Sequence, residues 1–182
     1  MAEYSLSLFL ADCNNLPFEP ESFDVVVSIY GPFTHLRNSV SCIQEMMRVL
    51  KRGGKIIVGV ENKWALLPLI RRVLKFEWSK IIMLLREGGK FTIFKKEIGQ
   101  EVLIWLQYYS LQQLVKLFRS AGFIKIKTYG GLLLVPQEYG YSPKRSLPFF
   151  KKILVWLERR LQDLTPFKNL ASYLFIEAKK PD

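Results

Sequence analysis

The sequence predicts an α/β domain built on parallel strands, and three observations predict it. Residues 24–28 are a short run rich in valine, residues 38–50 have the spacing of an amphipathic helix, and residues 55–60 are a second apolar run. Strand, helix and strand joined by short loops favour parallel strands with a right-handed crossover. Because both runs are almost continuously apolar, we expect strands that are buried on both faces.

Local signals mark the elements in the first half of the chain. Residues 5–11 alternate loosely and predict a strand that ends at Asp12, and residues 14–22 form a loop rich in Asn, Pro and acids. The helix of residues 38–50 has Asn38 or Ser39 as its N-cap and Gly53 just past its end. Residues 64–75 and 78–86 predict two short basic amphipathic helices, and residues 91–94 predict a strand or hairpin.

The second half of the chain is more regular. Ser110 is the expected N-cap of a helix that reaches Ala121, where Gly122 ends it. A strand over residues 123–129, a loop rich in Gly, Pro and Tyr over residues 130–143, and a long amphipathic helix over residues 146–164 follow. Residues 171–178 predict the last strand. We expect a single domain over residues 1–182.

Composition restricts the class of protein. The chain has 182 residues, of which 49% are apolar, enough for one hydrophobic core. One histidine and two cysteines without metal-like spacing argue against a zinc site. No window approaches the roughly 20 uninterrupted apolar residues of a membrane-spanning helix. The two cysteines, with no secretory leader before them, favour a reducing cytoplasmic setting.

The net charge of +11 is unevenly distributed, because the basic excess lies from Lys51 onward. Such asymmetry favours an anionic partner, whether a phosphate-bearing substrate, a nucleic acid or a lipid surface. The alternative is a solvated basic surface without a partner, as in many thermophilic proteins. No RNA-binding module of known pattern is visible in the sequence.

A succession of short motifs runs through residues 11–54. An acid closes an apolar segment, a Leu-Pro-Phe turn and a Phe-Asp pair follow, and a Gly-Pro loop, a helix ending Arg-Val-Leu-Lys and a Gly-Gly turn complete the order. This order resembles a class I S-adenosylmethionine-dependent methyltransferase of the type 11 kind. The segment Ala121-Gly122-Phe123 and a last strand followed by Lys180-Pro181 are similar to the tail of that family.

The resemblance implies a Rossmann-like methyltransferase sheet with helices on both faces and S-adenosylmethionine as cofactor. Residues 62–109 then form a substrate-cap insertion. The family's glycine-rich loop belongs before Asp12, where only eleven residues stand and none is glycine. We therefore expect an N-terminally incomplete sheet that lacks its first strands and belongs to a longer reading frame. The alternatives are that another chain fills the gap, or that residues 5–11 pair directly with residues 24–28.

The resemblance also implies cofactor-binding residues. Asp12 accepts a hydrogen bond from the adenine amine, and the backbone amide of Cys13 donates to the ring. Backbone groups of Ser28, Ile29 and Tyr30 face the ribose and the methionine part of the cofactor. The competing interpretation of Asp12 is an acid that caps its own loop through an Asx turn.

Two further residues are catalytic candidates. His35 stands in the loop after the first buried strand, where the family often has a histidine; the alternative is a structural histidine. Glu61 ends the second strand, at the edge where such sheets bind ligands, and either orients the acceptor or acts as a base. Its alternative role is the N-cap of the helix that begins near Trp64. Four tyrosines are candidates for the mouth of the site: Tyr108, Tyr109, Tyr139 and Tyr141.

Methyl transfer demands alignment of the acceptor and exclusion of water more than it demands reactive side chains. The amphipathic stretches 64–86 and 144–164 combine apolar faces with basic edges, as at a lipid headgroup boundary, although such helices also simply cover sheets. We expect a small-molecule acceptor, anionic or lipid-like rather than RNA, and peripheral membrane contact. The alternative is a non-catalytic methyltransferase-like scaffold with a basic surface that faces membrane or nucleic acid. Without a glycine-rich loop, the chain by itself should bind S-adenosylmethionine weakly or not at all.

Overall fold

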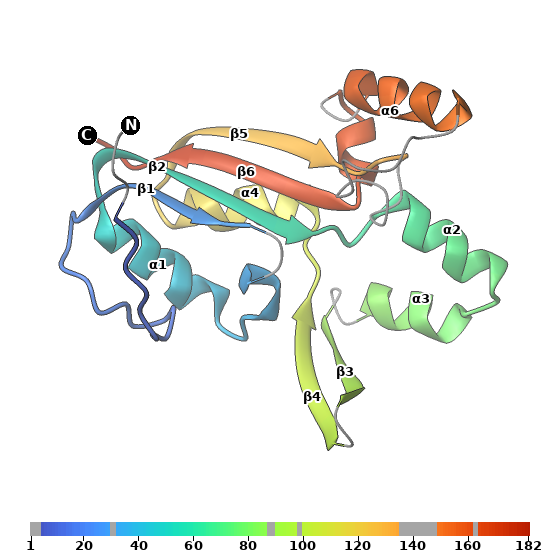
Figure 1. Cartoon of the computed structure of the whole chain (residues 1–182), viewed down its shortest axis with the longest axis horizontal. Coiled ribbons are helices and arrows are strands. Elements are labelled where there is room, and N and C mark those ends of the chain that lie inside the picture. The colour runs from blue at the N-terminus through green and yellow to red at the C-terminus, as the bar shows by residue number, and fades with distance from the viewer. Residues whose placement is uncertain (1–4, 30–31, 87–89, 98–99, 135–148, 162–163) are drawn as a thin grey trace.

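The computed structural model describes residues 5–29, 32–86, 90–97, 100–134, 149–161 and 164–182. Its main sheet has four strands in the order β1-β2-β6-β5, formed by Phe23–Ser28, Leu50–Glu61, Tyr173–Lys179 and Ile124–Gly131 respectively. β1 runs parallel to β2, whereas β6 is antiparallel to both of its neighbours (Figure 1). The α/β fold with parallel first strands is therefore confirmed.

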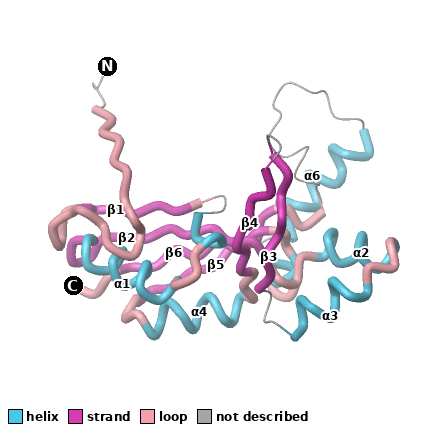
Figure 2. Tube along the Cα trace, turned by 90° about the horizontal axis from the view of Figure 1, so that it is seen from below, coloured by secondary structure: helices cyan, strands magenta, loops and turns pink. Residues whose placement is uncertain are grey.

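Two helices, α1 (Ser39–Val49) and α4 (Leu111–Ser120), cover the same face of this sheet (Figure 2). Alternate residues of β2 and β6 point into the core between the sheet and these helices. The apolar residues of both helices and both strands form one buried cluster: Cys42, Ile43 and Met46 of α1, Leu114 and Phe118 of α4, Ile56, Val58 and Val60 of β2, and Leu174, Ile176 and Ala178 of β6.

The predicted caps of both core helices are present. The Asn38 side chain accepts a hydrogen bond from the backbone N–H of Ser41 at the start of α1. Ser110 begins α4 with a capping box, in which its side chain and that of Gln113 each accept from the other residue's backbone N–H. These bonds satisfy N–H groups that a helix leaves without partners in its first turn.

The prediction that the first strand is buried on both faces is wrong for the described residues. Val25 and Val27 of β1 are 49% and 54% exposed, because α1 and α4 lie only on the other face. The predicted strand over residues 5–11 is also wrong. Leu6, Leu8 and Leu10 are 84–104% exposed, and no described strand lies beside this segment to accept its hydrogen bonds.

The residues between β2 and α4 add two helices and a hairpin. Helices α2 (Leu66–Leu74) and α3 (Trp78–Arg86) occur where the sequence predicted them. Strands β3 (Lys90–Glu97) and β4 (Gln100–Gln107) pair antiparallel in a second sheet, longer than the predicted hairpin. Figure 1 shows this hairpin extending away from the main sheet. The segment returns to its starting point, since Asn62 and Tyr109 form a parallel bridge.

The last helix, α6 (Phe149–Leu161), is fixed to the chain that follows β5 through one buried carboxylate. Glu158 accepts hydrogen bonds from the backbone N–H groups of Leu133 and Leu134, each at 2.6 Å. The short 3₁₀ helices η1 (Pro32–His35) and η2 (Phe167–Leu170) follow β1 and precede β6. None of the described helices is long and apolar enough to cross a membrane.

On the sheet face opposite α1 and α4, two glycines make room for one aromatic ring. A Cβ atom at Gly59 of β2 would lie 2.8 Å from the Phe175 ring, and one at Gly131 of β5 would lie 2.7 Å from it. Since real Cβ atoms avoid such distances, only glycine on both sides allows Phe175 of β6 to lie across its neighbours.

Gly59→Ala should therefore destabilise the protein by about 1–3 kcal/mol, the usual cost of overpacking. The midpoint of thermal unfolding should fall by about 2–4 °C per kcal/mol in a chain of this size. Adding Phe175→Leu to Gly59→Ala should recover part of the loss, since the smaller side chain leaves space for the new methyl group. A double variant no more stable than Gly59→Ala would contradict this packing explanation.

Candidate functional site

The carboxyl ends of β1 and β2 form one rim of the main sheet, where open α/β sheets bind ligands. Ser28, the last residue of β1, is buried. Ile29 follows it, and the Cα atom of Ile29 lies 3.6 Å from the position that a Cβ atom on Gly59 would occupy. Glu61 ends β2 at the same rim. The Thr34 hydroxyl of η1 accepts a hydrogen bond from the Glu61 N–H at 3.3 Å, which joins the loop after β1 to the end of β2.

His35 is held at this rim by the hairpin. Its Nδ1 lies 3.0 Å from the backbone carbonyl oxygen of Trp105 in β4. Because a carbonyl only accepts, Nδ1 carries the proton in this contact, so Nε2 is the acceptor nitrogen of the neutral tautomer that this contact selects. The imidazole is exposed, so Nε2 is available to a ligand at the rim.

The Trp105 side chain has a hydrogen-bond donor, its indole N–H, that makes no hydrogen bond to the described residues. The indole Nε1 atom is buried. The guanidinium of Arg37 lies 5.7 Å from the centre of the Trp105 ring, within the range of a cation–π contact. A buried N–H without a partner costs free energy, which a ligand that accepts its hydrogen bond would recover.

The carboxylate of Glu61 interacts with the Tyr108 hydroxyl. Burial raises the pKa of Tyr108 most, and the negative charge of Glu61 and a hydrogen bond to it raise this pKa further. The backbone N–H of Tyr109 donates to the Glu61 carbonyl oxygen at 3.2 Å. This bond holds Tyr108, the residue before Tyr109, at the same end of β2 as Glu61. The pair combines a proton-accepting carboxylate with a phenol that stays protonated at neutral pH.

The alternative role of Glu61 as a helix cap is not what the structure has. Its neighbour Asn62 accepts a hydrogen bond from the Trp64 N–H at 3.0 Å, in the turn before α2. The Asn62 amide also donates to the carbonyl oxygens of Asn169 and Ala171 at 2.8 and 2.6 Å. Asn62 is thus a structural residue, and the carboxylate of Glu61 is left to interact with Tyr108.

The described contacts of Asp12 and Cys13 are with residues outside this group. The Asp12 carboxylate accepts hydrogen bonds from the backbone and side-chain nitrogens of Asn14, each at 2.9 Å, and both bonds lower its pKa. This Asx turn is the loop-capping role that the sequence left open. The thiol of Cys13 contacts Cys42 of α1, and burial raises the pKa of both thiols. An adenine contact for Asp12 stays a prediction.

The loop after Asp12 is anchored to α1 rather than to the rim. Arg48 donates to the carbonyl oxygens of Phe18 and Leu16 at 2.8 and 3.0 Å, and Glu45 accepts from the Leu16 N–H at 2.9 Å. The hydrogen bonds of Arg48 and then of Leu16 lower the pKa of Glu45 to about 2. The Leu-Pro-Phe turn of the family motif is thereby given a structural role.

The structure thus brings Ser28, Ile29, His35 and Glu61 to one rim, together with Tyr108. Three predicted residues, Tyr30, Tyr139 and Tyr141, lie outside the described residues. Sequence reasoning missed Thr34 and Trp105, whose roles depend on contacts with residues 27 and 70 positions away in the sequence. No group of three or more His, Cys, Asp or Glu that could hold a metal occurs in the described part of the chain.

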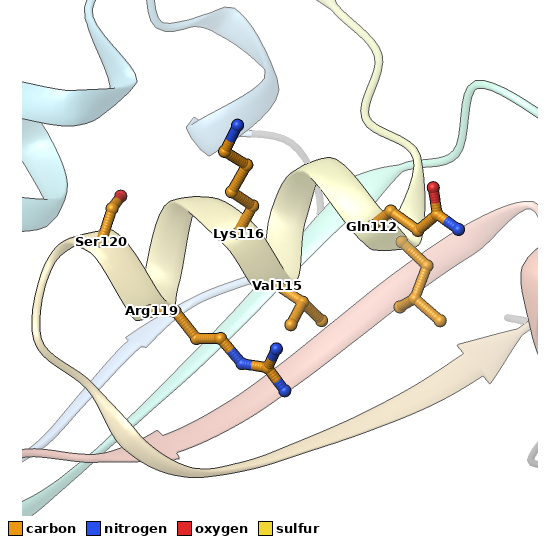
Figure 3. A pocket seen from close by; sticks show the side chains of 6 residues that line it. Gln112, Val115, Lys116, Arg119 and Ser120 are labelled. Atoms are coloured by element: carbon orange, nitrogen blue, oxygen red, sulfur yellow. The ribbon is translucent and has the colours of Figure 1, made fainter.

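A separate open hollow of about 550 Å³ lies along α4, lined by Leu111, Gln112, Val115, Lys116, Arg119 and Ser120 (Figure 3). All of these residues belong to one helix, and none is a predicted site residue. The polar groups at the rim, rather than this hollow, define the candidate site.

The comparisons with known proteins agree with this fold. Residues 2–58 match the family described as methyltransferase domain. A demethylmenaquinone methyltransferase of Staphylococcus haemolyticus is 32% identical over an alignment of 149 residues that covers 78% of this chain and 58% of that protein. An uncharacterized protein of Methanocaldococcus jannaschii is 28% identical over 121 residues, 66% of this chain and 47% of that protein. The chain therefore spans about half the length of these curated relatives.

Solved structures show the same fold at low identity. A SAM-dependent methyltransferase from Thermotoga maritima superimposes with a TM-score of 0.57 at 19% identity, covering 93% of this chain and 62% of that one. One from Methanosarcina mazei has a TM-score of 0.52 at 19% identity, covering 94% and 65%. The chain is thus related to the class I S-adenosylmethionine-dependent methyltransferases, and the predicted family and fold class are confirmed.

The Glu61–Tyr108 pair makes a prediction about pH. Glu61→Gln removes the charge and should lower the pKa of Tyr108, which should nevertheless stay above that of a free tyrosine because burial is the larger cause. Absorbance titration of tyrosinate, with Tyr108→Phe as the difference reference, measures this pKa. Glu21→Gln, an acid that pairs with Arg52 elsewhere, is the matched control and should leave it unchanged. A pKa of Tyr108 unmoved by Glu61→Gln would refute the pairing.

Proposed function

We propose that the protein takes part in transfer of a methyl group from S-adenosylmethionine to a hydrophobic small-molecule acceptor. The observation that carries this proposal is the match of residues 2–58 to the methyltransferase domain, whose two parallel strands end at the rim described above. The carboxyl ends of such strands are where α/β sheets bind their ligands.

The residues at the rim fit one part of the cofactor. Backbone groups at the end of β1, at Ser28 and Ile29, and the indole N–H of Trp105, which has no partner among the described residues, suit a ligand rich in hydroxyl and carboxylate acceptors. Asp12, which engages Asn14 in its own turn, makes no hydrogen bond to the described rim residues and would have to turn towards the adenine. When bound, S-adenosylmethionine supplies a methyl group that its sulfonium already activates.

The protein's own contribution is to orient the acceptor and hold its proton. Nε2 of His35 and the Glu61 carboxylate are proton acceptors at the rim, and the protonated Tyr108 hydroxyl offers a hydrogen-bond donor beside Glu61. An acceptor hydroxyl or acidic carbon that loses its proton to either base becomes the better nucleophile. The rings of Phe33 and Tyr109, 5.8 Å apart, support η1 from the core side.

The choice of a hydrophobic acceptor is supported by the relatives. Several are named demethylmenaquinone methyltransferase, including those of Staphylococcus haemolyticus and Lactococcus lactis. A lipid-tailed aromatic acceptor also agrees with the exposed apolar residues of the segment between β2 and α4. We therefore propose that residues 62–109 act as an insertion that covers the acceptor.

A product assay tests the proposal. The protein is incubated with S-adenosylmethionine and a reduced, prenylated naphthoquinone that lacks one ring methyl group, and the methylated product is measured by mass spectrometry. His35→Ala and Glu61→Gln should each lower the rate about 100-fold, the usual contribution of a positioned base. Lys116→Ala, on the outer side of α4, is the matched control and should leave the rate unchanged. Equal rates for all three variants would exclude the assigned roles.

Cofactor binding offers a second prediction, because it separates the enzyme from the scaffold alternative. Calorimetric titration with S-adenosylmethionine should show weak but saturable binding. Asp12→Ala should reduce the affinity by about 1–3 kcal/mol if the carboxylate receives the adenine amine. An unchanged dissociation constant would leave Asp12 with its loop-capping role alone. No binding and no product would favour a non-catalytic, methyltransferase-like binding module.

A further inference from the structure

The connection between α2 and α3 exposes an unusual concentration of apolar side chains. Leu74, Phe76 and Trp78 are 73%, 78% and 53% exposed within five residues. Helix α2 has no buried residue, and Ile70 and Val73 on it are also exposed. Figure 1 shows the α2–α3 connection on the far side of this pair of helices from the main sheet. We call residues 70–82, the end of α2, the connection and the start of α3, the α2–α3 tip.

The backbone at the α2–α3 tip is strained at Phe76, the most exposed of its apolar side chains. Phe76 has a φ of +54°, in the left-handed region that bulky residues avoid. Its N–H donates to the Val73 carbonyl and that of Glu77 donates to the Arg72 carbonyl, the pair of bonds of a Schellman motif. Phe76 thus occupies the position where helices usually place glycine.

Both features of Phe76 oppose stability. An exposed ring gains nothing from burial, and a side chain in the left-handed region adds steric strain. No described residue makes a ring contact with Phe76 that would compensate. Strain combined with exposure indicates a residue whose partner is outside the folded chain.

Basic residues surround these apolar side chains. Arg71 on α2, Lys75 just after it and Lys80 on α3 are exposed, and Arg72 is half-buried. The one acid among residues 70–82, Glu77, already pairs with Lys80 at 2.9 Å. The α2–α3 tip therefore presents positive charge around a protruding apolar group, and this charge distribution is complementary to an anionic surface.

We propose that the α2–α3 tip docks onto an anionic lipid bilayer, with Leu74, Phe76 and Trp78 inserted at the boundary between headgroups and acyl chains. Apolar and aromatic residues with basic neighbours are what this boundary accommodates, and tryptophan is favoured there. A nucleic acid would match the charge but not the aliphatic Leu74 and Val73. The proposal adds a partner that methyl transfer does not require, and it can hold or fail independently of it.

The decisive variant is Phe76→Gly, because its effects on binding and on stability should be opposite. Glycine removes the inserted ring and also relieves the left-handed strain. Co-sedimentation with phosphatidylcholine vesicles containing phosphatidylserine should fall at least fivefold, whereas the midpoint of thermal unfolding should stay equal or rise. A loss of binding therefore has no explanation in misfolding. Phe9→Gly, which removes a similarly exposed ring from the N-terminal segment, should bind as the wild type does.

Charge reversal tests the electrostatic half of the proposal. Arg71→Glu with Lys75→Glu should lower binding to the anionic vesicles by more than about tenfold, since each basic residue near such a surface contributes about 1 kcal/mol. The control Lys116→Glu with Arg119→Glu changes the net charge equally, on α4, and should lower binding much less. Pure phosphatidylcholine vesicles should bind the wild type weakly.

Three results would overturn the proposal: wild-type protein that stays in the supernatant with anionic vesicles, Phe76→Gly that binds as well as wild type, or equal losses in the two charge-reversal pairs. The last would indicate a general effect of net charge. Failure of the methyl-transfer assay would not affect these measurements, because they contain no cofactor and no acceptor.

Discussion

The main sheet is organised around β2, which is hydrogen-bonded along both edges. It pairs parallel with β1 and antiparallel with β6, so its twelve residues cannot shift in register without breaking two ladders. One face of β2 places Ile56, Val58 and Val60 in the core under α1 and α4. The same register places Glu61 at the rim. Packing of the core and position of the candidate site are therefore two consequences of one constraint.

The segment between β2 and α4 depends on the same strand. Its first residues bond to its last, since the Lys63 N–H donates to the Tyr109 carbonyl and the Tyr109 N–H donates to the Glu61 carbonyl. Asn62 adds side-chain bonds to the chain before β6. Because the segment between β2 and α4 begins and ends at the same place, its helices and hairpin lie beside the rim without changing the packing of the core. The hairpin also fixes the ring of His35, whose Nδ1 is hydrogen-bonded to the backbone carbonyl oxygen of Trp105.

Features that lower the stability of the fold occur at the rim and at the α2–α3 tip, whereas the core is closely packed. The buried indole N–H of Trp105 has no partner among the described residues, and Phe76 is strained and exposed. The core, in contrast, is formed by apolar side chains that are almost fully buried. A polar group without a hydrogen-bond partner and a strained, exposed side chain can both be stabilised by a bound molecule. Binding of a ligand at the rim and of a lipid surface at the α2–α3 tip would each supply such stabilisation.

The sequence by itself determined the elements whose signals are local. Asn38 and Ser110 begin their helices with side-chain caps, and the order of motifs in residues 11–54 identified the family, because caps and motifs involve residues only a few positions apart. The strand expected over residues 5–11 failed for the opposite reason: an alternating pattern becomes a strand only beside another strand. Tertiary structure alone decided that the Glu61 carboxylate contacts Tyr108, 47 positions away, and that Phe175 lies between Gly59 and Gly131. These relations depend on which strands become neighbours, and that follows from burying a shared core rather than from any local pattern.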